Sequence, residues 1–205
     1  NPCIGAKLPK VDNARERYLS IEEINLLRDT VKETNDKSLY IFLELLLQTG
    51  ARRFSILTLK KKDINLASKE VTTKNHKTNS TYKGFLQEDF IEPLNEYLKE
   101  FKINDDIFSY NENMDYSQTG HKLLTILDKL FNVGLASNDR KNRVVIHTLR
   151  HTMASHLAIN GTPIFTIQKL LNHSDIKQTM RYAKLSPESG KIAIQGLYKW
   201  EITII

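Results

Sequence analysis

The chain has 205 residues, of which 40% are hydrophobic, so it can bury one good core or two small ones and is neither disordered nor fibrous in composition. Its only cysteine is Cys3, which excludes an internal disulfide and favours a reducing compartment, and its apolar stretches, such as 41–47, are far shorter than the ~20 residues of a membrane span. We therefore expect a globular, cytoplasmic protein with no membrane segment.

The net charge of +6 is unevenly distributed. Residues 51–83 and residues 140–184 each have a net charge of +7, which leaves −8 for the rest of the chain. Two basic segments on an acidic background are typical of a surface that binds phosphates, where counterion release drives association. Two solvated helix faces are an equally good explanation from charge alone.

The first predicted elements are helical. Residues 1–17 contain two prolines and mixed charge, which indicates an interdomain linker. Ser20 and Glu23 have the spacing of a capping box, so a helix is predicted over 21–32. A second helix is predicted over 38–48, closed by Gly50.

The pattern then changes to short runs. Between residues 57 and 86 these runs are separated by polar turns at 65–68 and 75–80, which predicts a small antiparallel sheet. Helices resume over 93–99, 121–131, 147–159, 164–171 and 175–185; Asn160-Gly161 closes the third, and the fourth follows Pro163. The predicted fold is mainly α with a small antiparallel β-sheet (α+β).

Two motifs in this framework place arginines where an anion could bind. Arg52 follows Gly50 by two residues, where a helix ends and the chain reverses, so its side chain can project into a cleft. His147 and Arg150 stand at i and i+3 in the first turn of a predicted helix, whose free amides favour an anion. Taken singly, a surface arginine is the commoner explanation.

Two further motifs contribute a histidine, a tyrosine and a lysine. His173 lies in the break between two predicted helices, and Tyr182 follows nine residues later, well inside the second helix. Lys77 lies in the turn between two predicted strands, where it could reach over a ligand. The alternatives are a half-buried core tyrosine and a hairpin lysine that only provides solubility.

Together these side chains suit attack on a phosphodiester without a metal ion. Arginine forks bind non-bridging oxygens bidentately and stabilise charge in the transition state. A tyrosine, with a reference pKa of about 10, needs a nearby imidazole or guanidinium to become a nucleophile. The departing 5′ oxygen needs a proton, which a hairpin lysine can deliver.

These motifs resemble those of the tyrosine recombinase or phage integrase family, Xer-type recombinases included. "TGARRFSILTLKKKDI" is similar to the family's TG-x-R box, "HTLRHTMASHL" to its H-x-x-R box, and "LLNHSDIKQTMRYAKL" to its L-G-H-x-S to tyrosine box. The resemblance runs from the linker-like "NPCIGAKLPKV" to Leu185. It implies a catalytic domain over 18–185 after a linker over 1–17.

The resemblance also implies a role for each residue. Arg52 and Arg150 would bind phosphate, His147 and His173 would assist with His147 as a candidate base, Lys77 would be the general acid, and Tyr182 the nucleophile of a 3′-phosphotyrosyl intermediate. Lys74 and Lys83 share the hairpin with Lys77. No metal, ATP or other cofactor is implied.

The implied partners are double-stranded DNA and other copies of the chain. A monomer without DNA would form a homotetramer on a DNA synapse, and residues 186–205 would dock on a neighbouring protomer or pack on their own domain. An N-terminal DNA-clamping domain, usual in the family, is not visible in the sequence. The basic residues expected to contact DNA are Arg53, Lys60, Lys61, Lys62, Lys74, Arg140, Lys141 and Arg143.

The sequence departs from the family pattern at two positions. Ser55 stands where the family has an acidic residue, and Glu44 is a candidate replacement for that carboxylate. Asn172 stands where the family usually has glycine, and asparagine also adopts left-handed backbone angles at modest cost.

Three other functions stay open. A type IB topoisomerase uses a similar residue set to relax supercoils, and a non-catalytic DNA-binding module could keep the fold. A zinc hydrolase could use His147, His151, His156 and His173, but "HTLRH" lacks the glutamate of a metalloprotease helix and Arg150 would repel a cation. Neither the target DNA sequence nor the biological task can be read from the sequence.

Overall fold

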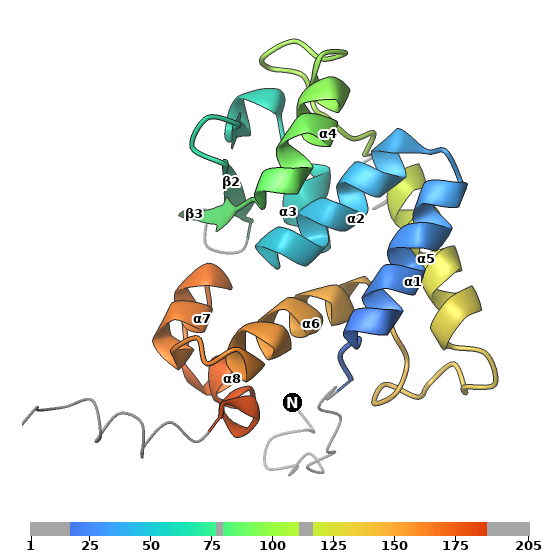
Figure 1. The fold of residues 1–205 in the computed structure, drawn as a ribbon, viewed down its shortest axis with the longest axis vertical. Coiled ribbons are helices and arrows are strands. Elements are labelled where there is room, and N and C mark those ends of the chain that lie inside the picture. The colour runs from blue at the N-terminus through green and yellow to red at the C-terminus, as the bar shows by residue number, and fades with distance from the viewer. Residues whose placement is uncertain (1–16, 77–79, 111–116, 188–205) are drawn as a thin grey trace, which may run out of the picture.

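The computed structural model describes residues 17–76, 80–110 and 117–187. Its centre is α2 (Lys37–Thr49), which contacts α1 (Ile21–Glu33), α5 (Gln118–Phe131) and α6 (Ile146–Ile159). In Figure 1, α1 and α5 lie together on one side of α2, while the sheet and α4 (Glu88–Leu98) lie on the other. The predicted α+β fold is confirmed.

The core forms around α2 because this helix is apolar on nearly every side. All its residues from Ile41 to Leu47 are buried, so neighbouring helices can pack on it from several directions. A smaller cluster lies at the far end of α6, where Ala154 and Ala158 pack with Ile167, Leu171 and Tyr182. This second cluster attaches α7 (Ile164–Leu170) and the 3-10 turn over Ala183–Leu185 to α6, and α8 (Lys177–Met180) contacts α7.

The helix boundaries follow local backbone chemistry. Ser20 and Glu23 form the predicted capping box: the Glu23 amide donates to Ser20 Oγ over 3.2 Å, and the Ser20 amide donates to Glu23 Oε2 over 2.9 Å. Gly50 ends α2 with a left-handed φ of 59°. A Cβ there would lie 2.9 Å from Met153 Sδ, so both the turn and the close approach of α6 favour glycine.

The sheet is smaller than predicted. It has the antiparallel order β1 (Ile64–Asn65), β2 (Glu70–Asn75), β3 (Ser80–Phe85), with Glu70 opposite Phe85 and Asn75 opposite Ser80. In the first predicted run, which begins at Leu57, only Ile64–Asn65 form a strand; Leu57 ends α3 (Arg53–Leu57), and a 3-10 turn covers Lys61–Asp63. The apolar residues at the start of this run, Leu57 and Leu59, are buried in the core without forming a strand.

Two predicted helices differ from the structure. Helix α4 begins at Glu88, before Pro93, because Phe90, Leu94 and Leu98 follow at helical spacing and are buried together. The last predicted helix, over 175–185, is broken: α8 ends at Met180 and a 3-10 turn covers Ala183–Leu185. Across the described ranges, no helix is long and apolar enough to span a membrane.

Candidate active site

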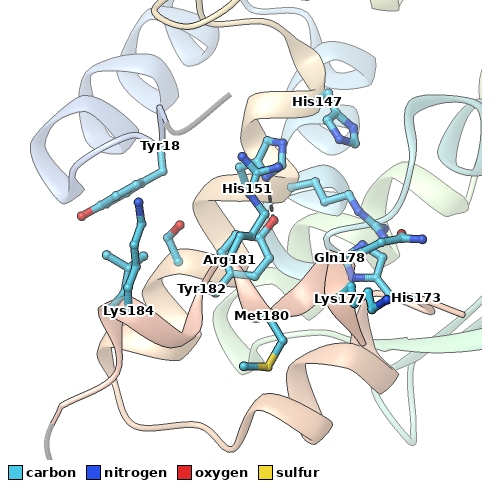
Figure 2. Close-up of a pocket in the computed structure, with 13 residues that line it drawn as sticks. Tyr18, His147, His151, His173, Lys177, Gln178, Met180, Arg181, Tyr182 and Lys184 are labelled. Carbon is cyan, nitrogen blue, oxygen red and sulfur yellow. Dashed lines mark hydrogen bonds between the residues drawn. The ribbon is translucent and has the colours of Figure 1, made fainter. Parts of the chain in front are cut away.

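A cleft of about 670 Å³ lies between α6 and the segment that follows α7. Its lining includes His147, Arg150 and His151 from α6 and His173 and Tyr182 from the later segment. Figure 2 shows His151 directly beside Tyr182 in this cleft. The structure thus gathers the predicted histidines, the second arginine and the tyrosine.

Arg150 lines this cleft and is only 3% exposed. Its Nη1 donates to the carbonyl of Gly50 over 2.7 Å, and its Nη2 donates to the carbonyl of Leu171. Burial and the nearby charge of Arg52 lower the pKa of Arg150 to about 10, so the guanidinium is still charged at neutral pH. Arg150 therefore joins the end of α2 to the end of α7 and keeps a positive charge in the cleft.

Arg52 approaches Arg150 from the start of α3. It is the N-cap residue of that helix, with extended backbone angles set directly after the left-handed turn at Gly50. Its Nη1 is buried and has no hydrogen-bond partner within the described residues. The charge of Arg52 lowers the pKa of both Arg150 and His173, which places the three groups together.

Two more buried polar atoms near Arg150 have no partner in the described part of the chain. They are the hydroxyl of Tyr82 on β3 and Nδ2 of Asn172, the residue after Leu171. Tyr82 is close enough for its phenol to raise the pKa of Arg150 against the effect of burial. Arg52 and Tyr82 both lie close enough to Arg150 to affect its pKa, so an anion bound beside Arg150 could accept a hydrogen bond from Nη1 of Arg52.

His173 follows a left-handed residue, as the sequence predicted. Asn172 has a φ of 49°. His173 Nδ1 is 2.8 Å from Thr179 Oγ1, which fixes the imidazole relative to α8. Burial first, and then the charges of Arg150 and Arg52, lower the pKa of His173 to about 4, so it is neutral at pH 7. His147 is exposed in the first turn of α6.

Tyr182 lies between α8 and the 3-10 turn and not well inside a helix, which corrects the sequence prediction. It is 4% exposed because its ring belongs to the small cluster on α6. Burial raises the pKa of Tyr182 above its usual value, although the charges of Arg181 and Arg150 act in the opposite direction. The phenol is therefore protonated at neutral pH.

The Tyr182 hydroxyl contacts His151, which the sequence suggested only as a zinc ligand. Its oxygen is 2.6 Å from Nδ1 of His151, which is itself 8% exposed (Figure 2). What the sequence does show is that His151 stands directly after Arg150 and one helical turn after His147, close to two predicted site residues. No local pattern, however, shows which α6 side chain meets Tyr182.

The candidate general acid, Lys77, lies outside the described residues. The strand before Lys77 is followed by His76, which lies beside α3. The ring centroids of His76 and Phe54 are 4.2 Å apart, and Nε2 of His76 is 3.0 Å from Oγ1 of Thr58. Of the other hairpin lysines, Lys83 forms an ion pair with Glu70 over 2.7 Å, and Lys74 is exposed on β2. The role of Lys77 stays a prediction.

Glu44 does not take the place of the acidic residue absent at Ser55. Arg28 donates to both oxygens of Glu44, over 2.6 and 2.9 Å, and Gln48 donates to one of them over 3.0 Å. The carboxylate thus neutralises Arg28 from α1. Ser55 donates instead to the carbonyl of Lys74 over 2.7 Å, which ties α3 to the hairpin strand.

The residues predicted to contact DNA have different environments. Lys60 pairs with Asp106 over 2.9 Å, Lys61 donates to the carbonyl of Phe101 over 2.8 Å, and Arg143 pairs with Asp128. Arg53 lies beside Gly120 of α5. Lys62, Lys74, Arg140 and Lys141 are exposed. Their contact with DNA stays a prediction.

The four histidines of the zinc alternative do not gather into a metal site. His156 Nε2 bonds to the carbonyl of Leu19 over 2.9 Å, and His151 bonds to Tyr182. Over the described ranges, no three His, Cys, Asp or Glu side chains are arranged to hold a metal ion. The geometry therefore gives the zinc alternative no support.

Comparison with known proteins gives one family and one fold. The model of the phage integrase family matches residues 17–189. Tyrosine recombinase XerA of Saccharolobus solfataricus is 30% identical over 185 residues, which are 90% of this chain but 58% of that recombinase, so this chain spans less than two thirds of its length.

Two solved structures share the fold. The catalytic domain of bacteriophage HP1 integrase has a TM-score of 0.64 and 20% identity, over 88% of this chain and 94% of that one. The XerH site-specific recombinase bound to difH substrate has a TM-score of 0.66 and 19% identity, over 95% of this chain and 58% of that one. Since the family model covers most of the residues, and the predicted arginines, histidines and tyrosine meet in one place, this chain belongs to the phage integrase family.

Proposed function

We propose that this chain is the catalytic domain of a site-specific DNA recombinase, which cleaves and rejoins strands through a 3′-phosphotyrosyl link to Tyr182 without metal or ATP. The observation that carries the proposal is the position of Tyr182 in a cleft with Arg150. The charge of Arg52 acts on Arg150, and Nη1 of Arg52 has no hydrogen-bond partner among the described residues. A nucleophile beside two guanidinium groups suits attack on a phosphodiester.

The arginines bind the scissile phosphate. Nη1 of Arg52 has no partner within the described ranges and is free to donate to the phosphate, and Arg150 adds charge from a position fixed by two backbone carbonyls. Positive groups that are already in place cost no reorganisation when charge develops on the non-bridging oxygens. His147 and His173 assist, and Lys77 protonates the 5′ oxygen that leaves.

His173 acts as a neutral donor in this scheme. If Thr179 donates its hydroxyl proton to Nδ1, the ring proton is on Nε2, which can then donate to a phosphate oxygen. A pKa of about 4 ensures that the ring does not add a third positive charge before DNA binds.

The partners follow from the relatives and belong to the same proposal. The substrate is double-stranded DNA, supported by the shared fold with XerH bound to difH and by the basic segments. Residues 18–185 form the catalytic domain after a linker over 1–17, and residues 186–205 dock on a neighbouring protomer in a homotetramer.

We place the reaction in the cytoplasm. Relaxation by a type IB topoisomerase is not favoured, because the relatives are recombinases.

The test is covalent adduct formation on nicked DNA. The chain is incubated with a pool of nicked duplexes of randomised sequence, from which the short 5′-OH strand can diffuse away, and adducts are separated by denaturing electrophoresis in excess chelator. We expect an adduct with the parent chain and none with Tyr182→Phe, which lacks only the attacking oxygen. Tyr18→Phe is the matched control, because Tyr18 lines the same cleft.

The outcomes separate the alternatives. An adduct retained by Tyr182→Phe would exclude Tyr182 as the nucleophile. DNA binding by the parent chain without any adduct would favour the non-catalytic module, and a requirement for one specific metal would revive the hydrolase.

A further inference from the structure

The Tyr182 hydroxyl is held by a histidine outside the motif roles described above. We propose that His151 is the catalytic residue that accepts the phenolic proton of Tyr182 at Nδ1 when the strand is cut, and returns it when the strand is rejoined. The proposal rests on the strand-transfer function above and names the base for that reaction.

The geometry of the pair is suited to proton transfer. Nδ1 of His151 and the oxygen of Tyr182 are 2.6 Å apart, and both side chains are buried. The neighbouring Arg150 is bonded to the ends of α2 and α7, which fixes this turn of α6, and the edge of the His147 ring packs on His151 with centroids 4.8 Å apart. Because His151 is already in hydrogen-bond contact, no movement is needed before it can accept the proton.

Tyr182 needs such an acceptor. Its burial opposes formation of a free tyrosinate, since the anion would lose hydration. Among the described residues that line the cleft there is no Asp or Glu to take the proton. The hydrogen bond recorded for the hydroxyl goes to His151, and Figure 2 shows the ring of His151 beside the phenol.

The surroundings of His151 are rich in positive charge. Besides Tyr18 and Tyr182, the titratable and charged groups that line the cleft, from α6 and from the segment after α7, are His147, Arg150, His173, Lys177, Arg181 and Lys184. Arg52 adds its charge from the start of α3. A bound phosphodiester would bring negative charge next to these groups and would stabilise the imidazolium that forms when His151 accepts the proton.

The chemical step balances in both directions. The Tyr182 oxygen forms a bond to phosphorus while its proton moves to His151 Nδ1, and the bond from phosphorus to the 5′ oxygen breaks as that oxygen takes a proton from the general acid. On rejoining, the 5′ hydroxyl attacks phosphorus and gives up its proton, and the imidazolium of His151 returns a proton to the departing phenol. No net oxidation or proton uptake occurs over the cycle.

The test must separate proton transfer from positioning. In His151→Asn the side-chain oxygen can take the place of Nδ1 and hold the phenol by a hydrogen bond, but it cannot take up a proton near neutral pH. His151→Ala loses both functions. His156→Gln is the matched control on the same helix, because His156 uses Nε2 to bond to Leu19 and does not contact Tyr182 in the described hydrogen bonds.

The readout is single-turnover cleavage of nicked DNA as a function of pH, with DNA binding measured in parallel. We expect His151→Asn and His151→Ala to cleave about 10²- to 10⁴-fold more slowly at pH 7, with rates that rise as the pH approaches the pKa of the phenol, whereas His156→Gln stays close to the parent. A fluorinated tyrosine at position 182, whose phenol is more acidic, should restore much of the rate of His151→Asn. Added imidazole should do so for His151→Ala.

Parent-like cleavage by His151→Asn would overturn the proposal and reduce His151 to a positioning residue. If that variant does not fold, the decision passes to His151→Ala: a failure of imidazole to restore cleavage, in a variant that still binds DNA, would also overturn it. An absence of adduct from the parent chain would count instead against the recombinase function.

Discussion

Because Nη1 of Arg52 is buried without a hydrogen-bond partner among the described residues, replacing Arg52 should stabilise the protein while it abolishes activity. A buried polar atom without a hydrogen bond costs about 1–3 kcal/mol, and here it also faces the charge of Arg150. Arg52→Met keeps an unbranched side chain and removes both penalties. Because Arg52 is partly exposed, we take the low end, about 1 kcal/mol, which raises Tm by about 2–4 °C in a domain of this size.

Arg150→Met should have the opposite effect on stability. Arg150 donates to the carbonyls of Gly50 and Leu171, so its loss leaves two buried acceptors unsatisfied at about 1–3 kcal/mol each. The variant should lose several degrees of Tm or more. Both variants should fail to form the adduct, since each lacks a group that binds the phosphate.

The assay is thermal unfolding followed by circular dichroism, first in a buffer without phosphate and then with added orthovanadate. An anion that binds the native site raises Tm by mass action, so the parent chain should gain stability and Arg52→Met should not. If Arg52→Met lowered Tm as much as Arg150→Met does, Arg52 would be a structural residue. Equal stabilisation of the parent and Arg52→Met by the anion would likewise refute the phosphate site.

Three further predictions concern other residues. The pKa of His173 is about 4 in the folded protein and about 6.5 in an unfolded chain, so the parent should lose stability as the pH falls from about 6.5 towards 4. A plot of Tm against pH for His173→Asn should lack this loss, and parallel curves for the parent and the variant would contradict the assignment. Asn172→Ala should cost about 1–2 kcal/mol in urea unfolding because of its left-handed backbone, whereas Asn172→Gly should cost much less, and equal losses would point to the side chain. If Lys62 contacts DNA, Lys62→Ala should reduce the slope of log K against log salt by about 0.9. Lys60→Ala should reduce that slope less because Lys60 pairs with Asp106, and an unchanged slope for Lys62→Ala would show that Lys62 is only solvated.

Much of the framework could be predicted from the sequence because it depends on local chemistry. The capping box of Ser20 and Glu23, the left-handed turn at Gly50 and the positive φ of Asn172 each involve only a few neighbouring residues. The helix starts and ends that these signals mark were predicted within a few residues. The spacing of the motifs likewise identified Arg52, His147, Arg150, His173 and Tyr182 as candidates.

Other elements were wrong where packing outweighed local pattern. The run that begins at Leu57 was predicted as a strand, yet only Ile64 and Asn65 of it form β1, after a 3-10 turn over Lys61–Asp63. The helix predicted through Tyr182 is interrupted, with the ring buried against Ala154 and Leu171. Glu44 looked free to serve the active site, but Arg28 on the neighbouring helix neutralises it.

The sequence by itself determined which chemical groups are present and which short segments become helices and turns, since those depend on interactions within a few residues. Only the tertiary structure decided how the groups are paired. His151 and Tyr182 are 31 positions apart, and Arg150 is 100 positions from the Gly50 carbonyl that it binds. Such contacts form when helices pack to bury their apolar faces, and the spacing of residues along the chain does not specify which side chains then meet.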